Sequence, residues 1–229
     1  MTRIAAASDG RGGLTRNRPV NPKNTAFLVI DVQHYCTFPG EGEWEHIDPQ
    51  NIPSNLLYYF ERIKKMVLPN IARIQQACRK TNIEVIYTII ESLTSDGRER
   101  GLDYKISGFL VPKGSPWAKI PDEIKPLSDE IIIPKGSSSV FNSTNIDYIL
   151  RNLEIDYLIV AGLVTDQCVE TAVRDACDRG FLVTLVTDAC GTYTHERHEA
   201  SLQALKTYCR QITTDKLIAE LEQFSQNPY

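Results

Sequence analysis

Short apolar runs recur along the chain and alternate with amphipathic segments. The runs predict six strands, at 26–30, 83–90, 129–133, 156–162, 181–187 and 209–213. Apolar residues at helical spacing predict helices at 56–80, 145–152, 165–179, 195–207 and 215–223. We expect Pro134 to end the third strand and Pro69 to be tolerated as a break within the first helix.

This alternation predicts the fold class α/β, as a single three-layer α/β/α domain around a six-stranded, mainly parallel sheet. No internal repeat or interdomain linker interrupts residues 25–225, so one domain is expected there. Residues 1–24 carry four arginines, several glycines and few large apolar residues. They are expected to form a flexible or oligomer-contacting N-terminal arm.

Composition and charge narrow the class of partner. The chain has 229 residues, of which 42% are hydrophobic and 24% charged, and this excludes a disordered chain. Its 25 basic and 29 acidic residues give a net charge of −4, which argues against nucleic acid. No apolar run is long enough for a transmembrane helix, and the N-terminus is too weakly apolar for a secretory signal. We expect a cytoplasmic protein that binds a small molecule, with no nucleic acid and no membrane partner.

The six cysteines carry no disulfide signature. They lie at 36, 78, 168, 177, 190 and 209, with no CxxC pair and no dense cluster. A domain of this size builds a core without covalent links, so free and mostly buried thiols are expected.

Candidate chemistry follows from where the predicted strands end. Parallel sheets bind ligands at the carboxyl ends of their strands. The residues just beyond those ends are Asp31, Glu91, Lys135, the turn 163–168 and Asp188. An acid, a cation and the thiol of Cys168 are therefore expected on one rim, from three different strands.

Cys168 is the distinctive cysteine because it lies at the start of a predicted helix. A helix N-terminus favours a thiolate, and its free N–H groups can bind an oxyanion. Asp31 could accept the thiol proton, and Lys135 could lower the thiol pKa and keep Asp31 ionised. Each residue taken alone has a simpler interpretation: Cys168 as a small buried thiol, Asp31 as a turn-forming acid and Lys135 as a solvated lysine. Their expected convergence favours a nucleophilic site.

Three segments resemble the cysteine hydrolase branch of the isochorismatase-like superfamily. They are Phe27–Gln33, Ile133–Lys135 with Phe141–Thr144 behind it, and Gly162–Ala172. Val186–Ala189 and Glu196–His198 also fit, so that the resemblance spans about residues 25–220. The resemblance implies a covalent amidase in which Asp31 is the general base and acid, Cys168 the nucleophile and Lys135 a stabiliser of charge. It also implies an oxyanion hole from the backbone N–H groups of Val164 and Cys168, beside a cis peptide at Leu163–Val164.

The sequence departs from the nicotinamidase pattern of the same superfamily. Nicotinamidases carry an Asp-x-His metal motif after the second strand, where this chain reads Thr88–Ser92 without a histidine. His195 and His198 share one helix face, where capping and packing explain them better than a metal. We therefore expect no metal and no cofactor. The intact triad also argues against isochorismatases, whose vinyl ether cleavage does not need the cysteine.

What remains is the branch that includes N-carbamoylsarcosine, ureidoacrylate and biuret amidohydrolases. The polar loop 91–105 is long enough for a lid. Candidate substrate-binding residues are Tyr35, Phe38, Phe141 and Tyr193 as pocket walls, although aromatic residues at such places equally serve packing. Glu91 could orient a substrate amino group or be a surface turn residue.

The sequence thus predicts a metal-independent cysteine amidohydrolase that releases ammonia from a small ureido or carbamoyl compound, in ureide or nitrogen metabolism. The alternatives are a nicotinamidase-like amidase and a non-catalytic binding protein on the same fold. Members of the superfamily are commonly homo-oligomers, so the resemblance implies a homo-oligomer, with a tetramer favoured.

Overall fold

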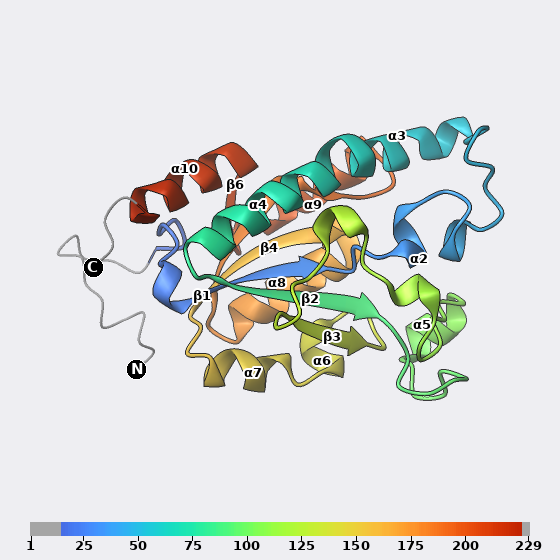
Figure 1. Cartoon of the computed structure of the whole chain (residues 1–229), viewed down its shortest axis with the longest axis horizontal. Coiled ribbons are helices and arrows are strands. Elements are labelled where there is room, and N and C mark those ends of the chain that lie inside the picture. The colour runs from blue at the N-terminus through green and yellow to red at the C-terminus, as the bar shows by residue number, and fades with distance from the viewer. Residues whose placement is uncertain (1–14, 226–229) are drawn as a thin grey trace.

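The computed structural model describes residues 15–225, and these form one sheet of six parallel strands with helices on both faces (Figure 1). The strand order is β3-β2-β1-β4-β5-β6. The predicted three-layer fold is therefore confirmed, and every neighbouring pair of strands is parallel. Residues 1–14 of the predicted arm lie outside the described residues.

The strands agree closely with the apolar runs of the sequence. They are β1 Thr25–Ile30, β2 Glu84–Ile90, β3 Ile131–Lys135, β4 Tyr157–Leu163, β5 Leu182–Gly191 and β6 Arg210–Ile212. Every residue of β1 and β4 is buried, as their continuous apolar sequences predict for central parallel strands.

The helices fall between the strands, with additional short turns in the loops. The α-helices are α2 His34–Thr37, α3 Ser54–Arg62, α4 Leu68–Lys80, α5 Leu102–Ile106, α6 Val140–Ser143, α7 Ile146–Asn152, α8 Glu170–Asp178, α9 His195–Leu205 and α10 Thr214–Ser225. Two π-helical turns, η3 Ile63–Val67 and η6 Thr165–Val169, precede α4 and α8. Four 3-10 turns complete the set: η1 Pro22–Asn24, η2 Gly42–Trp44, η4 Pro116–Ala118 and η5 Asp122–Ile124.

Two helical layers cover the sheet. Helices α4 and α10 pack together against one face, and α8 packs against α6 and α9 on the other. The carboxyl ends of β1 and β2 point toward the end of the molecule that carries α2 and α5 (Figure 1). Strands β2 and β3 extend the sheet on one side of β1, and strands β4 to β6 extend it on the other, so the order of strand addition reverses between β1 and β4. This is the switch point at which open α/β sheets bind ligands.

The predicted end of the third strand at Pro134 is wrong. Strand β3 continues through Pro134 to Lys135, and Pro134 pairs in register with Ile89. Because β3 lies at the edge of the sheet, the missing N–H of proline removes no ladder hydrogen bond on that side.

Two other element boundaries differ from the sequence-based expectation. The predicted helix 56–80 is helical throughout but contains the π turn η3, which ends two residues before Pro69. An irregular turn of this kind is a common place for a proline within a helix. Strand β5 extends to Gly191, so Asp188 lies within the strand rather than after it. The Asp188 carboxylate accepts hydrogen bonds from the backbone N–H and hydroxyl of Thr214 at the start of α10, both at 2.8 Å.

The described part of the N-terminal segment lies against the domain. Val20 is buried, and its N–H donates to Glu220 Oε1 at 2.8 Å. Among the described residues, no helix has the length and apolar character needed to cross a membrane.

Candidate active site

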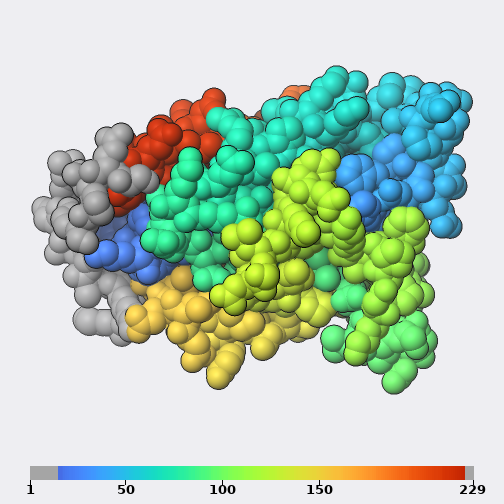
Figure 2. Space-filling model, viewed as in Figure 1, coloured from blue at the N-terminus to red at the C-terminus, as the bar shows by residue number. Residues whose placement is uncertain are grey.

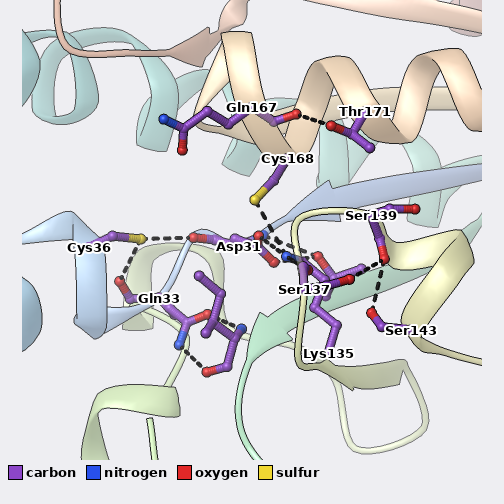
Figure 3. A network of polar contacts seen from close by, with 12 residues as sticks. Asp31, Gln33, Cys36, Lys135, Ser137, Ser139, Ser143, Gln167, Cys168 and Thr171 are labelled. Carbon is purple, nitrogen blue, oxygen red and sulfur yellow. Dashed lines mark hydrogen bonds and ion pairs between the residues drawn. The ribbon is translucent and has the colours of Figure 1, made fainter. Parts of the chain in front are cut away.

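Asp31, Lys135 and Cys168 meet at the carboxyl edge of the sheet. Lys135 Nζ lies 2.8 Å from Asp31 Oδ2 and 3.4 Å from Cys168 Sγ. Figure 3 shows the three side chains pointing toward one another from three separate segments. All three are nearly inaccessible to solvent, with exposed fractions of 1%, 1% and 6%. The convergence predicted from the strand ends is therefore present in the structure.

Asp31 follows the last residue of β1 and turns the chain away from the sheet. Its φ of 52° lies in the left-handed region, which aspartate tolerates better than most side chains. Thr88 of the neighbouring strand β2 donates its hydroxyl to Asp31 Oδ1 at 2.7 Å. Among the described residues, Asp31 Oδ2 has no hydrogen bond besides its ion-pair contact with Lys135, so this oxygen can accept a proton.

Lys135 reaches the site from β3, two strands away from β1. Neighbouring strands are about 4.8 Å apart, and β2 lies between β3 and β1, so only a long side chain reaches from β3 to the end of β1. Lys135 Nζ also lies 3.0 Å from the hydroxyl oxygen of Tyr104 and 2.8 Å from the carbonyl oxygen of Ser137. Four acceptors therefore surround three ammonium hydrogens, and Cys168 Sγ is the most distant of them.

Tyr104 joins the cluster from α5, in the long loop after β2. It is 1% exposed, and its hydroxyl oxygen lies 3.7 Å from Cys168 Sγ. Because Lys135 donates to this oxygen, the hydroxyl hydrogen is free to point at the sulfur. Sequence analysis did not identify Tyr104, because nothing in the sequence distinguishes this tyrosine of a polar loop from a surface residue.

Cys168 lies in the turn between β4 and α8. The Leu163–Val164 peptide is cis, as the resemblance implied. Gly162 before it has a φ of 131°, and a Cβ there would lie 2.1 Å from the carbonyl oxygen of Ile30. Only glycine therefore permits β4 to approach the end of β1 so closely, which brings the cysteine turn beside Asp31.

Electrostatics make Cys168 a thiol in the resting site. Burial raises its pKa to about 11, and the nearby Lys135 ammonium offsets only part of that rise. Burial alone would lower the pKa of Lys135, but the charges of Asp31 and Cys168 outweigh it and raise that pKa well above its usual value. The sequence predicted a thiolate from the effect of the helix N-terminus, but burial of Cys168 raises the pKa by more than that effect lowers it. The thiol therefore needs a base to lose its proton.

A buried histidine holds the turn that carries Cys168. His198 Nδ1 lies 2.9 Å from the hydroxyl of Thr165, and its Nε2 lies 2.8 Å from Arg62 Nη2. Arg62 also donates to the carbonyl oxygens of Thr187 and Cys190. Burial, followed by the Arg62 charge, lowers the pKa of His198 to about 4, so the ring is neutral at pH 7. His198 thus links α9 and α3 to the first residue of η6, in the packing role expected from sequence.

A small pocket opens onto the thiol. It is lined by Asp31, Tyr35, Cys36, Glu43, Ile90, Tyr104, Phe109, Ser138, Leu163, Val164, Gln167, Cys168 and Tyr193. Its free volume is about 30 Å³, which is comparable to one water molecule. Part of the lining comes from the segments after β1 and β2, which lie at the same end of the molecule in Figure 2 (light blue and lime green, at the right).

The predicted substrate-binding residues separate into two groups. Tyr35 and Tyr193 line the pocket, as do the two residues of the expected oxyanion hole, Val164 and Cys168. The other three lie outside the pocket lining. Phe38 lines a separate groove of about 620 Å³ beside α3, Glu91 accepts from the N–H of Gly114 at 2.8 Å, and Phe141 packs against Phe181.

The pocket also contains residues that sequence analysis missed. Glu43, Phe109 and Gln167 belong to its lining, together with Tyr104. Phe109 packs edge-on against the rings of both Tyr35 and Tyr104. Tyr104 and Glu43 lie in the short helical turns α5 and η2, and Phe109 lies in a loop, so none of them has a periodic signal in the sequence. Gln167 adjoins the predicted nucleophile and could have been found by that position.

Within the described range 15–225, no group of three or more His, Cys, Asp or Glu side chains is arranged to hold a metal ion. The six cysteines are free thiols, and all except Cys177 are buried.

Comparison with known proteins identifies relatives of several activities. The family model described as Isochorismatase domain matches residues 25–216. N-carbamoylsarcosine amidase of Arthrobacter sp is 35% identical over 76% of this chain, and the match covers 60% of that relative's length. Nicotinamidase 3 of Arabidopsis thaliana is 29% identical over 87% of this chain and 89% of its own. Ureidoacrylate amidohydrolase RutB of Rhizobium rhizogenes is 27% identical over 74% of this chain and 71% of its own.

Solved structures share the fold over most of their length. A cysteine hydrolase from Pseudomonas syringae superposes with a TM-score of 0.77 at 23% identity, covering 90% of this chain and 96% of that one. N-carbamoylsarcosine amidase from Thermoplasma acidophilum gives a TM-score of 0.62 at 22% identity, covering 84% and 97%. Since the domain model spans nearly the whole ordered sheet and its relatives include several amide hydrolases, the chain belongs to the isochorismatase family.

Proposed function

We propose that the protein hydrolyses a C–N amide bond in a small ureido or carbamoyl compound through a cysteine thioester, releasing ammonia. The observation that carries this proposal is the contact set around Lys135, whose ammonium group touches both a carboxylate and a thiol in one buried pocket. The relatives named as carbamoylsarcosine and ureidoacrylate hydrolases support the substrate class.

In the first step Asp31 accepts the thiol proton of Cys168 while the sulfur attacks the carbonyl carbon of the substrate. The C–S bond forms as the carbonyl π electrons move to oxygen. Burial holds the thiol protonated until this moment, so proton transfer and attack belong to one event. Lys135 beside both groups stabilises the negative charge as it passes from carboxylate to sulfur.

In the second step the tetrahedral intermediate collapses. The oxyanion re-forms the carbonyl, the C–N bond breaks, and Asp31 returns its proton to the leaving nitrogen, which departs as ammonia. We assign the oxyanion to the backbone N–H groups of Val164 and Cys168, and both of these residues line the pocket. A carbamoyl or acyl thioester on Cys168 remains.

Water completes the cycle. Asp31 accepts a proton from a water molecule that attacks the thioester carbon, and the C–S bond breaks as the proton returns to sulfur. The acid product leaves and the free thiol is restored. We propose that this chemistry uses no metal and no cofactor, since the segment after β2 lacks the histidine of the nicotinamidase metal motif.

A nicotinamidase-like amidase is the second candidate. The match to Nicotinamidase 3 over 87% of the chain favours it, and the same three side chains could open a nicotinamide amide. For the assembly and location we propose a homotetramer in a reducing cytoplasm, where Cys168 stays a free thiol.

The test is ammonia release from a panel of biuret, ureidoacrylate, N-carbamoyl amino acids and nicotinamide. Wild-type protein should release ammonia from a ureido or carbamoyl compound, and Cys168→Ala should lose that activity. Cys190→Ala is the matched control, because this cysteine is also buried but lies in β5 outside the pocket. Turnover of nicotinamide alone would favour the second candidate, and full activity of Cys168→Ala would overturn both.

A further inference from the structure

The pocket holds a second carboxylate that the proposed mechanism does not use. Glu43 lies in the short turn η2 and lines the same pocket as Asp31 and Cys168. The loop that carries it is fixed by a close approach: a Cβ on Gly42 would lie 2.1 Å from the carbonyl oxygen of Tyr35. With a φ of 53°, position 42 suits glycine, and this contact places Glu43 beside the wall formed by Tyr35.

Among the described residues, no hydrogen bond and no ion pair reaches the carboxyl group of Glu43. The Glu43 side chain is half-buried, and a carboxylate that is partly withdrawn from water without a donor is destabilised. The surrounding side chains are Tyr35, Cys36, Tyr59 and Tyr193, whose pKa values are all raised in part by the charge of Glu43. The missing donor must therefore come from a bound molecule or from water.

The pocket lining contains no arginine and no lysine among the described residues. The Lys135 ammonium is already shared among Asp31, Tyr104 and Ser137. Arg100 donates to the carbonyl oxygens of Gly97 and Phe109, and Arg197 pairs with Asp166. The accessible pocket thus presents carboxylates without a cation to receive a substrate carboxylate.

We propose that Glu43 is a specificity-determining residue that selects uncharged or cationic ureido and amide substrates and rejects those that carry a carboxylate. Its oxygens would accept hydrogen bonds from the N–H groups at the end of the substrate remote from the scissile carbonyl. This inference rests on the proposed function. It separates the chain from its relatives, since N-carbamoylsarcosine and ureidoacrylate are both carboxylates.

The preference for uncharged over anionic substrates should increase with pH. Burial raises the pKa of Glu43 to about 7, so its charged fraction grows between about pH 6 and 8. Tyr35, Cys36, Tyr59 and Tyr193, which face Glu43, have raised pKa values and stay neutral over that range. Rejection of an anionic substrate should therefore strengthen as pH rises.

The test compares N-carbamoylglycinamide with N-carbamoylglycine, which differ only in an amide against a carboxylate. Wild-type protein should favour the amide by about 10-fold or more in kcat/KM, because like charges repel strongly in a pocket with little solvent. The ratio should rise with pH. Glu43→Gln should bring the ratio near one and remove its pH dependence, whereas Glu45→Gln, an exposed neighbour, should change neither.

A binding measurement separates failure of this inference from failure of the proposed function. If wild-type protein cleaves neither compound, calorimetry on Cys168→Ala still decides the role of Glu43. Tighter binding of the amide, lost in Cys168→Ala/Glu43→Gln, supports selection by Glu43. Equal binding of the two compounds, binding of neither, a preference for the carboxylate, or an unchanged ratio in Glu43→Gln would overturn it.

Discussion

At the scale of single residues, the main feature of the site is that Lys135 has more hydrogen-bond acceptors around it than it has hydrogens to donate. Lys135 has three ammonium hydrogens for four neighbours, and Cys168 Sγ is the farthest of these at 3.4 Å. Tyr104 compensates, because its hydroxyl hydrogen is free to reach the sulfur. In the proposed mechanism, stabilisation of the nascent thiolate is therefore divided between Lys135, which the sequence predicted, and Tyr104, which it did not.

Removing the Tyr104 hydroxyl should make the thiol harder to ionise. In Tyr104→Phe we expect Cys168 to react with iodoacetamide about 10-fold more slowly near pH 8, since one hydrogen bond to a charged group is lost. The pH midpoint of alkylation should move upward relative to wild type, because the hydrogen bond from Tyr104 lowers the pKa of Cys168. Peptide mass spectrometry over a pH series follows this thiol separately from the other five.

The matched control is Tyr87→Phe, which removes a buried hydroxyl in the network of Gln75 and Glu130 rather than at the thiol. The role assigned to Tyr104 is wrong if Tyr104→Phe leaves the alkylation profile unchanged, or if both variants shift it equally.

At the scale of elements, the turn between β4 and α8 depends on contacts from two helices. His198 of α9 bonds Thr165 at the start of η6, and Arg62 of α3 bonds His198. Cys168, the proposed nucleophile, is thus positioned by Arg62, 106 residues before it (168 − 62), and His198, 30 residues after it (198 − 168). This arrangement explains why His198 is buried on the inner face of α9, together with Ser201, Leu202 and Leu205.

Replacing His198 should destabilise this turn. His198→Ala leaves the Thr165 hydroxyl and one Arg62 hydrogen-bonding group without partners, which costs about 2–3 kcal/mol in the free energy of unfolding. Denaturant titration at pH 7 measures that loss. His195→Ala, at the exposed start of the same helix, should cost much less. Equal losses in the two variants would contradict the bridging role.

The same histidine gives the fold a pH dependence of known sign. In the unfolded chain His198 binds a proton near its usual pKa of 6.5, but burial lowers that pKa to about 4 in the folded chain. Between these values the unfolded state binds more protons, so stability is fully present above about pH 6.5 and falls as pH drops toward 4. Denaturant titrations in that window should show this slope weakened in His198→Ala.

At the scale of the whole molecule, strand order decides which residues meet. Because β1 and β4 are neighbours at the switch point, Asp31 and Cys168 come together although 137 positions separate them (168 − 31). The apolar runs predicted all six strands, and the carboxyl-end rule then predicted the cluster of Asp31, Lys135 and Cys168. Those two steps worked because buried parallel strands have a strong hydrophobic signal.

The remainder of the site could not be predicted, for a physical reason. Tyr104, Phe109 and Glu43 reach the pocket from the long connections after β1 and β2, which hold only short helical turns and whose course is set by tertiary contacts rather than by local periodicity. Glu91 and Phe141 were predicted to face the pocket, but Glu91 accepts a hydrogen bond from the Gly114 backbone and Phe141 packs against Phe181. The prediction that Pro134 ends the third strand was wrong for a related reason. A proline is tolerated within β3 because β3 is an edge strand, and the sequence alone does not show which strand lies at the edge.

The central claim is a covalent intermediate on Cys168, and rapid-quench mass spectrometry during turnover of a carbamoyl substrate tests it most directly. The account predicts that the peptide containing Cys168 gains the mass of the carbamoyl or acyl group within one turnover and loses it as substrate is exhausted. No such adduct should form on the peptides of the five other cysteines. Sustained ammonia release with Cys168 unmodified at every quench time would contradict the account.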